Sequence, residues 1–315
     1  MGLNLINCTY DEINITGKYV SGGFAGYVDS GANGLISSLK NTTDQEMIIG
    51  ANSTITANTN TSYAGGIFGL VKTNFEVNNT DGESSCKNVV VEGVNVSATN
   101  QAGGYVGQFT DSSSRDKIYQ LKNAIFKNGS VTTNNNIGGL IGNSESNQTN
   151  IISDCTVENS TLNTGNNDNK QSGGLIGRLG SGAIQIANSK IISLTESGSY
   201  SGGLIGEVIG TVTVTDTEIT GTESRNTSIN STNGSSAIYG RLSTNNPITI
   251  ERCKISYNTI TTSQWSGSAF SGDIHWQSGT NANISIYDSS VEHVGITAPF
   301  SRRNSRASTR YANCY

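Results

Sequence analysis

Two glycine-rich phrases are the first residues in this 315-residue chain whose types and spacing suggest chemistry. The chain reads QSGGLIGRL at residues 171–179 and YSGGLIGEV at residues 200–208. Glycine-rich loops present backbone N–H groups that cradle phosphates, so one such phrase would predict a nucleotide site. A phosphate loop occurs once per site, whereas related phrases occur eight times along this chain. The recurrence therefore favours a structural repeat over nucleotide binding.

The ionisable residues show no arrangement that is typical of an active site. Enzymes that cleave polysaccharides on β-helices need a pair of carboxylates on one face, and here Asp and Glu scatter singly over turns. The two histidines, His275 and His293, are each isolated in the sequence, and no H-E-x-x-H zinc signature is present. We therefore predict that the chain is not an enzyme and has no catalytic residue, metal or cofactor.

The composition narrows the class of protein further. Charged residues make up 14% of the chain and the net charge is −5, which gives no basic footprint for nucleic acid. No run of 18 apolar residues exists, so we expect no transmembrane segment. The first ten residues lack the basic region and apolar stretch of a signal peptide, so secretion would require a leader outside this sequence.

The glycine phrases follow the pattern small-small-apolar-x-Gly-x-apolar, and successive copies begin 29 to 43 residues apart. The copies are GGFAGYV (22–28), GGIFGLV (65–71), GGYVGQF (103–109), GGLIGNS (138–144), GGLIGRL (173–179), GGLIGEV (202–208), SAIYGRL (236–242) and SAFSGDI (268–274). Short segments with Val and Ile at every second position separate them, as in TVTVTDTEIT at 211–220. Alternation with a period of two predicts strands with one buried face.

Each repeat thus supplies about three short strands, and one repeat cannot bury its apolar face alone. We predict an all-β fold, a parallel β-helix or β-solenoid with about eight to nine rungs of roughly 29–43 residues. Residues 1–299 form the single solenoid domain, and residues 300–315 form a basic, irregular C-terminal tail. One predicted inward column consists of Ile15, Ile55, Val96, Val131, Leu162, Ile191, Ile219, Ile260 and Val291.

The residues on either side of this column should face outward. Two rungs place threonine on both sides, Thr54 with Thr56 and Thr259 with Thr261. Flat threonine ladders on a β-solenoid are typical of ice-binding proteins. In the predicted alignment Lys190, Glu218 and Glu292 interrupt the ladder, which argues against that function.

The third position of the glycine phrase is apolar in every copy and the seventh in every copy except at Ser144, and both should point into the core. The fourth position is apolar too, except at Ser271 in the last copy, and two interpretations stay open. Either the backbone bulges near the glycine so that two consecutive side chains turn inward, or the fourth positions form an exposed apolar stripe that contacts a partner. The residues of this candidate partner surface are Phe68, Val106, Ile141, Ile176, Ile205 and Tyr239.

The phrase G-[LI]-x-G with a preceding glycine, repeated every 30 to 40 residues, resembles the GLUG-type repeat. The resemblance covers about residues 8–292. That repeat occurs in large secreted and cell-surface proteins, including adhesins and bacterial IgA-cleaving metallopeptidases. The resemblance implies a spacer or display module. It implies no peptidase activity, because that activity resides in a separate domain of those proteins.

Two groups of side chains bear on compartment and ligands. Cys8, Cys155 and Cys253 share an inward column several rungs apart, too far for disulfides, whereas Cys86 and Cys314 lie outside the pattern. Trp265 and Trp276 flank the last glycine phrase and are candidates for stacking on a glycan or for packing at the end of the solenoid. The candidate N-glycosylation sites are Asn7, Asn14, Asn41, Asn52, Asn60, Asn78, Asn95, Asn128, Asn147, Asn159, Asn226, Asn230, Asn233 and Asn283.

We predict a non-enzymatic structural protein of an extracellular or cell-surface fibre, glycosylated and self-associating into a filament through open strand edges. The alternative is an adhesin-type module that binds a glycan or a host or cell-surface protein through the long insertions after Gly26 and Gly69. The third candidate is a polysaccharide-active β-helix enzyme.

Overall fold

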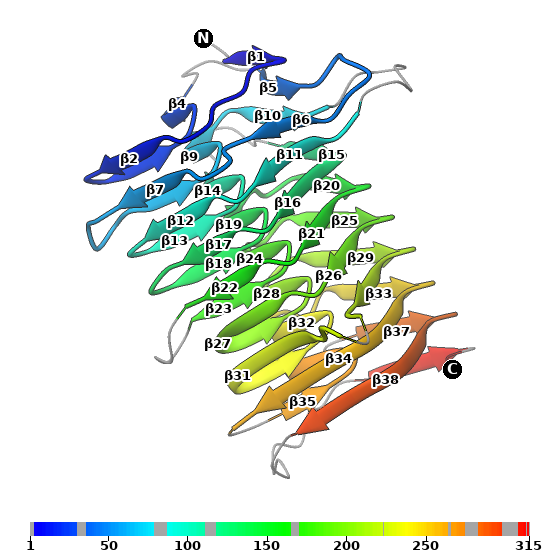
Figure 1. Cartoon of the computed structure of the whole chain (residues 1–315). Helices are drawn as coiled ribbons and strands as arrows, with labels where there is room; N and C mark the ends of the chain where they lie inside the picture. Colours follow the sequence, from blue (N-terminus) through cyan, green and yellow to red (C-terminus); the bar gives the residue numbers. More distant parts are fainter. Residues whose placement is uncertain are drawn as a thin grey trace.

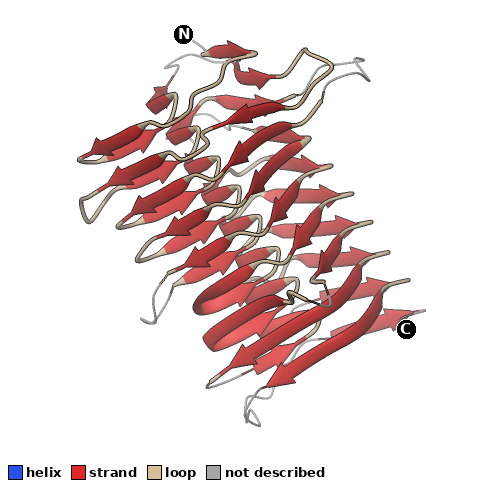
Figure 2. Cartoon of the chain, viewed as in Figure 1, coloured by secondary structure: helices blue, strands red, loops and turns tan. Residues whose placement is uncertain are grey.

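The computed structural model describes residues 3–29, 36–78, 87–110, 118–164, 170–222, 224–263, 266–274, 283–297, 308–312 and 314, with the backbone alone at 36, 266, 271–274 and 308–312. The described residues contain strands and turns and no helix (Figure 2). The strands stack in order along one axis, from the N-terminal end to the C-terminal end (Figure 1). Every strand pairing is parallel, and the strands belong to three sheets.

Sheet A has ten strands. The strands are β1 (Asn4–Ile6), β5 (Ile36–Lys40), β10 (Asn74–Val77), β15 (Tyr119–Lys122), β20 (Thr149–Ser153), β25 (Ala183–Ala187), β29 (Thr211–Thr215), β33 (Pro247–Glu251), β37 (Asn283–Tyr287) and β39 (Ser308–Ala312). Of these, β10, β15, β20, β25, β29, β33 and β37 alternate buried and more exposed residues.

Sheet B has 21 strands and consists of three successive legs of each rung. The first leg contains β6 (Met47–Ile49), β11 (Val89–Glu92), β16 (Ala124–Lys127), β21 (Thr156–Glu158), β26 (Lys190–Ile192) and β30 (Glu218–Thr220). The second contains β2 (Asn14–Gly17), β7 (Thr54–Ala57), β12 (Asn95–Ala98), β17 (Ser130–Thr132) and β22 (Thr161–Asn163). The third contains β3 (Val20–Gly22), β8 (Tyr63–Gly65), β13 (Gln101–Gly103), β18 (Asn136–Gly138), β23 (Gln171–Gly173) and β35 (Ser266–Ser268).

Four longer strands of sheet B span two legs each. The first and second legs are joined in β34 (Lys254–Thr262) and β38 (Ser290–Thr297), and the second and third legs in β27 (Thr195–Gly202) and β31 (Thr227–Ser236). Sheet C has eight strands, one from each glycine phrase: β4 (Ala25–Asp29), β9 (Phe68–Lys72), β14 (Val106–Thr110), β19 (Ile141–Glu145), β24 (Ile176–Leu179), β28 (Ile205–Val208), β32 (Tyr239–Leu242) and β36 (Ser271–Ile274).

The predicted fold class, an all-β parallel solenoid, is confirmed, and each rung passes through sheets A, B and C in turn. Two details of the prediction are wrong. Within the predicted irregular tail, β39 pairs with β37 and adds a tenth strand to sheet A. The predicted inward column also mixes two legs, because Ile191 pairs with Val157 in the first leg, whereas Leu162 pairs with Glu196 in the second.

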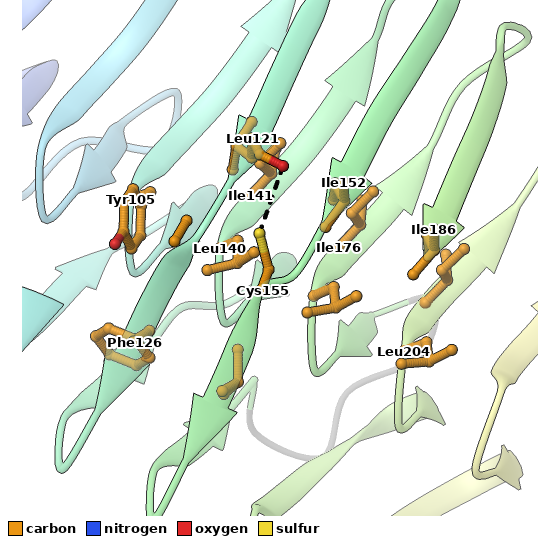
Figure 3. Packing of buried hydrophobic residues seen from close by; sticks show 14 of the residues in the cluster. Tyr105, Leu121, Phe126, Leu140, Ile141, Ile152, Cys155, Ile176, Ile186 and Leu204 are labelled. Atoms are coloured by element: carbon orange, nitrogen blue, oxygen red, sulfur yellow. Dashed lines mark hydrogen bonds between the residues drawn. The ribbon is translucent and has the colours of Figure 1, made fainter. Parts of the chain in front are cut away.

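The core lies between the three sheets and is built from stacked apolar columns. Around the fourth and fifth rungs, Leu121, Leu140 and Ile152 are fully buried and point into the interior (Figure 3). The Tyr105 hydroxyl reaches across the core and donates to backbone carbonyls of the first leg. Burial of these side chains is the main favourable term for the stack.

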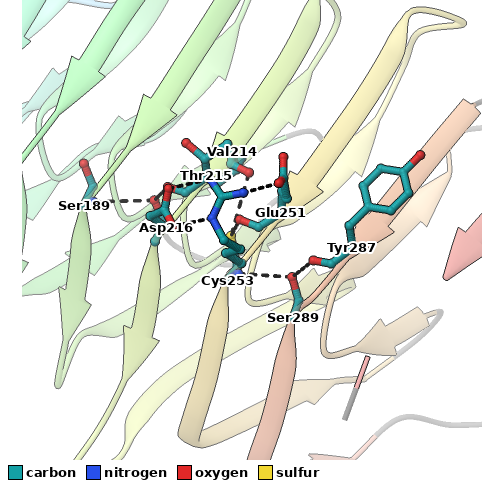
Figure 4. A network of polar contacts seen from close by, with 10 residues as sticks. Ser189, Val214, Thr215, Asp216, Glu251, Cys253, Tyr287 and Ser289 are labelled. Carbon is teal, nitrogen blue, oxygen red and sulfur yellow. Dashed lines mark hydrogen bonds and ion pairs between the residues drawn. The ribbon is translucent and has the colours of Figure 1, made fainter. Parts of the chain in front are cut away.

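A ladder of small side chains marks the corner between sheet A and the first leg (Figure 4). Ser189, Thr217 and Ser289 each donate a hydroxyl hydrogen bond of 2.7–2.9 Å to the carbonyl two residues earlier. The Cys253 amide in turn donates to Ser289 Oγ of the next rung at 3.1 Å. Cys155 occupies an equivalent place, and its amide donates to Ser189 Oγ at 3.3 Å.

These cysteines are free, as predicted, and so is Cys8. They stand at hydroxyl positions of a corner, however, and their thiols donate to backbone carbonyls, as Cys155 Sγ does to the Ser153 carbonyl at 3.2 Å. Burial raises the pKa of Cys155 to about 12, so the thiol stays protonated at neutral pH. Cys86 lies outside the described residues.

In the six copies of the phrase that begin with Gly-Gly, backbones of successive rungs come very close at the corner between sheets B and C. A Cβ atom on Gly104 would lie 2.1 Å from the carbonyl oxygen of Gly139, and one on Gly139 would lie 2.1 Å from that of Gly174. The last glycine of the phrase has the same constraint, since a Cβ on Gly142 would lie 2.4 Å from the Gly107 carbonyl oxygen. No side chain fits at these places.

We expect Gly139→Ala to destabilise the protein by about 3 kcal/mol or more, since the new methyl group meets backbone atoms that cannot rotate away. Gly295→Ala is the matched control, because nothing lies within 4 Å of a Cβ at that position. We expect it to change the free energy of unfolding by less than about 0.5 kcal/mol. Urea denaturation midpoints measure both; similar losses in the two variants would contradict the steric explanation.

Candidate functional site

The fourth-position residues predicted as an exposed partner surface are buried, which overturns that interpretation. Phe68, Val106, Ile141, Ile176, Ile205 and Tyr239 are all 0% exposed. The chain bends between sheets B and C just before these residues, and one carbonyl, that of Leu140, accepts hydrogen bonds from both Tyr105 N and Val106 N. Two consecutive side chains therefore point into the core at the bend, which makes this part of the motif structural.

The tryptophans predicted to stack on a glycan, Trp265 and Trp276, lie outside the described residues, and so does His275. His293 is described and has a structural place at the corner between the first and second legs. Its φ is 51° and its ring stacks on Tyr257 of the preceding rung, with centroids 4.9 Å apart. The long insertions after Gly26 and Gly69, predicted as binding loops, contain the sheet A strands β5 and β10, and their residues 30–35 and 79–86 lie outside the described residues.

The candidate glycosylation sites divide by exposure. Asn7, Asn14, Asn52, Asn60, Asn95, Asn128, Asn147, Asn226 and Asn283 are exposed, Asn159 and Asn230 are half-buried, and Asn41, Asn78 and Asn233 are buried. The Asn41 amide donates to the carbonyls of Gln45 and Asn88 at 2.7 and 3.0 Å, and the Asn78 amide donates to Lys87 O at 2.8 Å. A glycan on either nitrogen has no room in the folded chain.

A structural reason accounts for many of the N-x-[ST] motifs in this sequence. Asparagine occupies left-handed corner positions more readily than most residues do. Asn52, Asn128 and Asn159 have φ angles of 47–57° at the corner that leads into the second leg. Two residues later the chain presents an outward Thr or Ser of that leg, and the corner geometry thereby produces the N-x-[ST] pattern.

The outer face of the second leg carries two columns of hydroxyl and amide side chains, which we call the second-leg array. The register stacks Asn14, Thr54, Asn95, Ser130, Thr161, Thr195, Ser228, Thr259 and Gly295 in one column. It stacks Thr16, Thr56, Ser97, Thr132, Asn163, Ser197, Asn230, Thr261 and Thr297 in the other. All of these residues are exposed or half-exposed, and none is charged.

The charged residues that interrupted this ladder in the predicted alignment lie on another leg. Lys190, Glu218 and Glu292 project from β26, β30 and the first-leg part of β38. There they form ion pairs between neighbouring rungs, with Lys190 Nζ 3.3 Å from Glu218 Oε2 and Lys254 Nζ 3.6 Å from Glu292 Oε2. The two legs therefore separate charged from uncharged side chains, and the array is continuous over nine rungs, about 38 Å at the usual strand spacing.

Hydrogen bonds tie parts of the array together along the stack. Ser130 Oγ donates to Asn95 Oδ1 at 2.5 Å, and Ser197 Oγ donates to Asn163 Oδ1 at 3.2 Å. Each bond joins side chains of adjacent rungs, so their positions repeat with the rung spacing. The array can offer donors and acceptors at regular intervals to a flat, uncharged ligand surface.

An ion-pair ladder occupies the outer face of sheet C. Glu207, whose side chain is 8% exposed, lies between Arg178 Nε at 3.2 Å and Arg241 Nη1 at 3.5 Å, and it accepts a hydrogen bond from Ser243 Oγ at 2.9 Å. The Arg241 guanidinium stacks on the ring of Tyr200 at 4.8 Å. The partners of the Glu207 carboxylate come from the rungs before and after it, so this ladder holds neighbouring rungs together.

Sequence reasoning missed Glu196, which occupies an inward, apolar column of the second leg and is 0% exposed. Only the correct register would have revealed it, because the predicted alignment placed Ile191 in that column. Among the described residues no group of three His, Cys, Asp or Glu side chains could hold a metal ion. No helix long and apolar enough to cross a membrane occurs in that part of the chain either.

Comparison with known proteins adds no identification. No protein family, no curated protein and no solved structure matches the chain. The resemblance to the GLUG-type repeat therefore stays a resemblance of sequence pattern.

We expect Glu207→Gln to destabilise the protein by about 1–3 kcal/mol, because it leaves two partly buried arginines without their anion. Glu218→Gln removes an exposed ion pair and should cost less than about 1 kcal/mol. Chemical denaturation at two salt concentrations compares the two variants. Equal losses would show that the sheet C ladder contributes no more than a surface pair.

Proposed function

We propose that the chain is a non-enzymatic structural protein of an extracellular or cell-surface assembly, and that copies stack end to end into filaments. The observation that carries this proposal is that every rung joins the next by the same parallel strand pairing, so a rung of a second copy can continue the stack by the same contacts. β1, β2, β3 and β4 each pair with a strand on one side only in the described structure. Their other edges present backbone N–H and C=O groups that can accept further strands.

The side chains of the end rungs agree with this proposal. The core residues Leu5 and Ile15 are half-buried on the first rung, whereas their partners in the second rung, Leu39 and Ile55, are 0% exposed. At the other end, Ile296 belongs to the same column as Ile15 and is 46% exposed. In a head-to-tail contact, the last rung of one copy would cover the first rung of the next and bury apolar surface of both, and repetition of this contact would be open-ended.

Glycans fit this proposal at the exposed asparagines, and extracellular or surface location remains part of it. Asn14, Asn95 and Asn230 belong to the second-leg array, so glycans there would cover it. Asn7, Asn60, Asn147 and Asn283 lie outside the array and would leave it accessible.

We expect micromolar protein to form polymers, seen by negative-stain electron microscopy and by light scattering. Ile6→Lys with Tyr19→Lys adds charge to the first rung at side chains that are 54% and 53% exposed, and should reduce polymer mass at least tenfold. Ile192→Lys, on the lateral face of the sixth rung, is the control and should polymerise like the wild type. A monodisperse monomer at high concentration would contradict the proposal.

The continuous array favours a second function, binding to ice. The charged residues that argued against this function lie on the first leg. The array itself has a hydroxyl or amide side chain at every position except Gly295. An uncharged array with a regular spacing suits a ligand surface that is also uncharged and regular, such as ordered water.

We expect the wild-type chain to inhibit recrystallisation of ice at micromolar concentration. Thr56→Lys combined with Thr132→Lys places two ammonium groups in the array and should weaken inhibition at least tenfold. Thr249→Lys, an outward residue of sheet A, is the matched control and should retain activity. If the unglycosylated wild-type chain forms polymers but does not inhibit ice recrystallisation, ice binding is excluded and the structural function remains.

A further inference from the structure

Glu196 interrupts an otherwise apolar column in the middle of the stack. Its neighbours along the column are Leu162 in β22 and Ile229 in β31, and all three are 0% exposed. Thr195 and Ser197, which flank it in β27, point outward into the second-leg array. The carboxyl group therefore lies directly beneath the array at the sixth rung.

The carboxyl group has few polar neighbours to compensate its burial. Neither Oε1 nor Oε2 makes a hydrogen bond of normal geometry, and the Ser172 hydroxyl in β23 also lacks a partner. Burial raises the pKa of Glu196 to about 8 and outweighs nearby Ser172 and the backbone of Gly202, which lower it. A buried carboxyl group without partners is far more stable as the neutral acid than as the anion.

The elements around the carboxyl group supply no charge to pair with an anion. β22 and β31 place Leu162 and Ile229 against it, and β23 places Ser172 there. The ionisable side chain next to β23 is Lys170, whose Nζ donates to the Thr164 carbonyl oxygen at 3.2 Å. No charged group contributes to the pKa of Glu196.

The direction of the pH effect follows from linkage. Glutamate in the unfolded or locally opened chain ionises near its ordinary pKa of 4.5, whereas the folded chain keeps the proton up to about pH 8. The opened state is therefore favoured progressively as pH rises through this window. Each pH unit changes the opening equilibrium by up to about tenfold, and the effect levels off above the folded pKa.

We propose that Glu196 makes the second leg of the sixth rung a pH-sensitive element. With the acid protonated, the column is complete and β27 holds the array in register. With the acid ionised, the carboxylate leaves the interior, so the second-leg part of β27 separates from β22 and the array divides at this rung. The inference does not depend on what the array binds, since it concerns the stability of the strand itself.

The test is hydrogen exchange of the full chain between pH 5 and pH 9, corrected for the intrinsic exchange rate and read on peptides that cover β27. We expect protection of the wild-type strand to fall by about tenfold per unit in the middle of this window. Glu196→Gln keeps the shape of the side chain and cannot ionise, so its protection should be independent of pH. Glu196→Ile matches the neighbouring column residues and should be the most protected variant.

Peptides that cover β21 and β26, in the first leg, are the internal control and should show no such slope. Glu207→Gln, on sheet C, should keep the wild-type slope in β27. If wild-type and Glu196→Gln chains show the same pH dependence in β27, the proposal is wrong. Because the glutamine variant is nearly isosteric, this outcome remains readable even where the isoleucine variant fails to fold.

Discussion

The close approach of backbones at the glycine corner is the constraint on which the rest of the structure depends. Gly104, Gly139 and Gly174 each face the carbonyl oxygen of the equivalent residue in the next rung, at a distance that no side chain would permit. This contact fixes the spacing and the lateral position of successive rungs at one point. Sheet C follows immediately after the corner, and the columns of sheets A and B then align above one another because every rung starts from the same place.

The sequence was sufficient to predict the solenoid and the inward third position of the phrase, because the glycine phrases mark the same corner in every rung. It was not sufficient for the register of sheet B. The first and second legs have the same apolar alternation, and the number of residues between them and the glycine phrase varies. In the fifth and sixth rungs Leu162 and Ile191 look equivalent by pattern, yet they belong to different legs. Only the backbone pairing separates them.

The surfaces depended on this register more than the core did. An alignment that is wrong by one leg usually replaces one apolar core residue by another, which changes little in the core. On the outer face, however, it replaces Thr195 by Lys190 and thus a neutral surface by a charged one. The same shift concealed Glu196, since a buried acid is visible only when its column is known. The predicted exposure of the fourth position of the phrase was wrong for another reason. Alternation of inward and outward side chains assumes a straight strand, whereas the chain bends between Tyr105 and Val106.

Among the described residues, the strands of each rung pair only with strands of the rungs directly before and after it. Stability in such a stack is approximately a sum of rung terms and nearest-neighbour terms, so no distant contact fixes the number of rungs. A whole repeat can therefore be gained or lost between equivalent glycines, for example between Gly142 and Gly177, without disturbing the junction. The length of the molecule is then a quantity that duplication and deletion can adjust in steps of about 4.8 Å, one rung at a time.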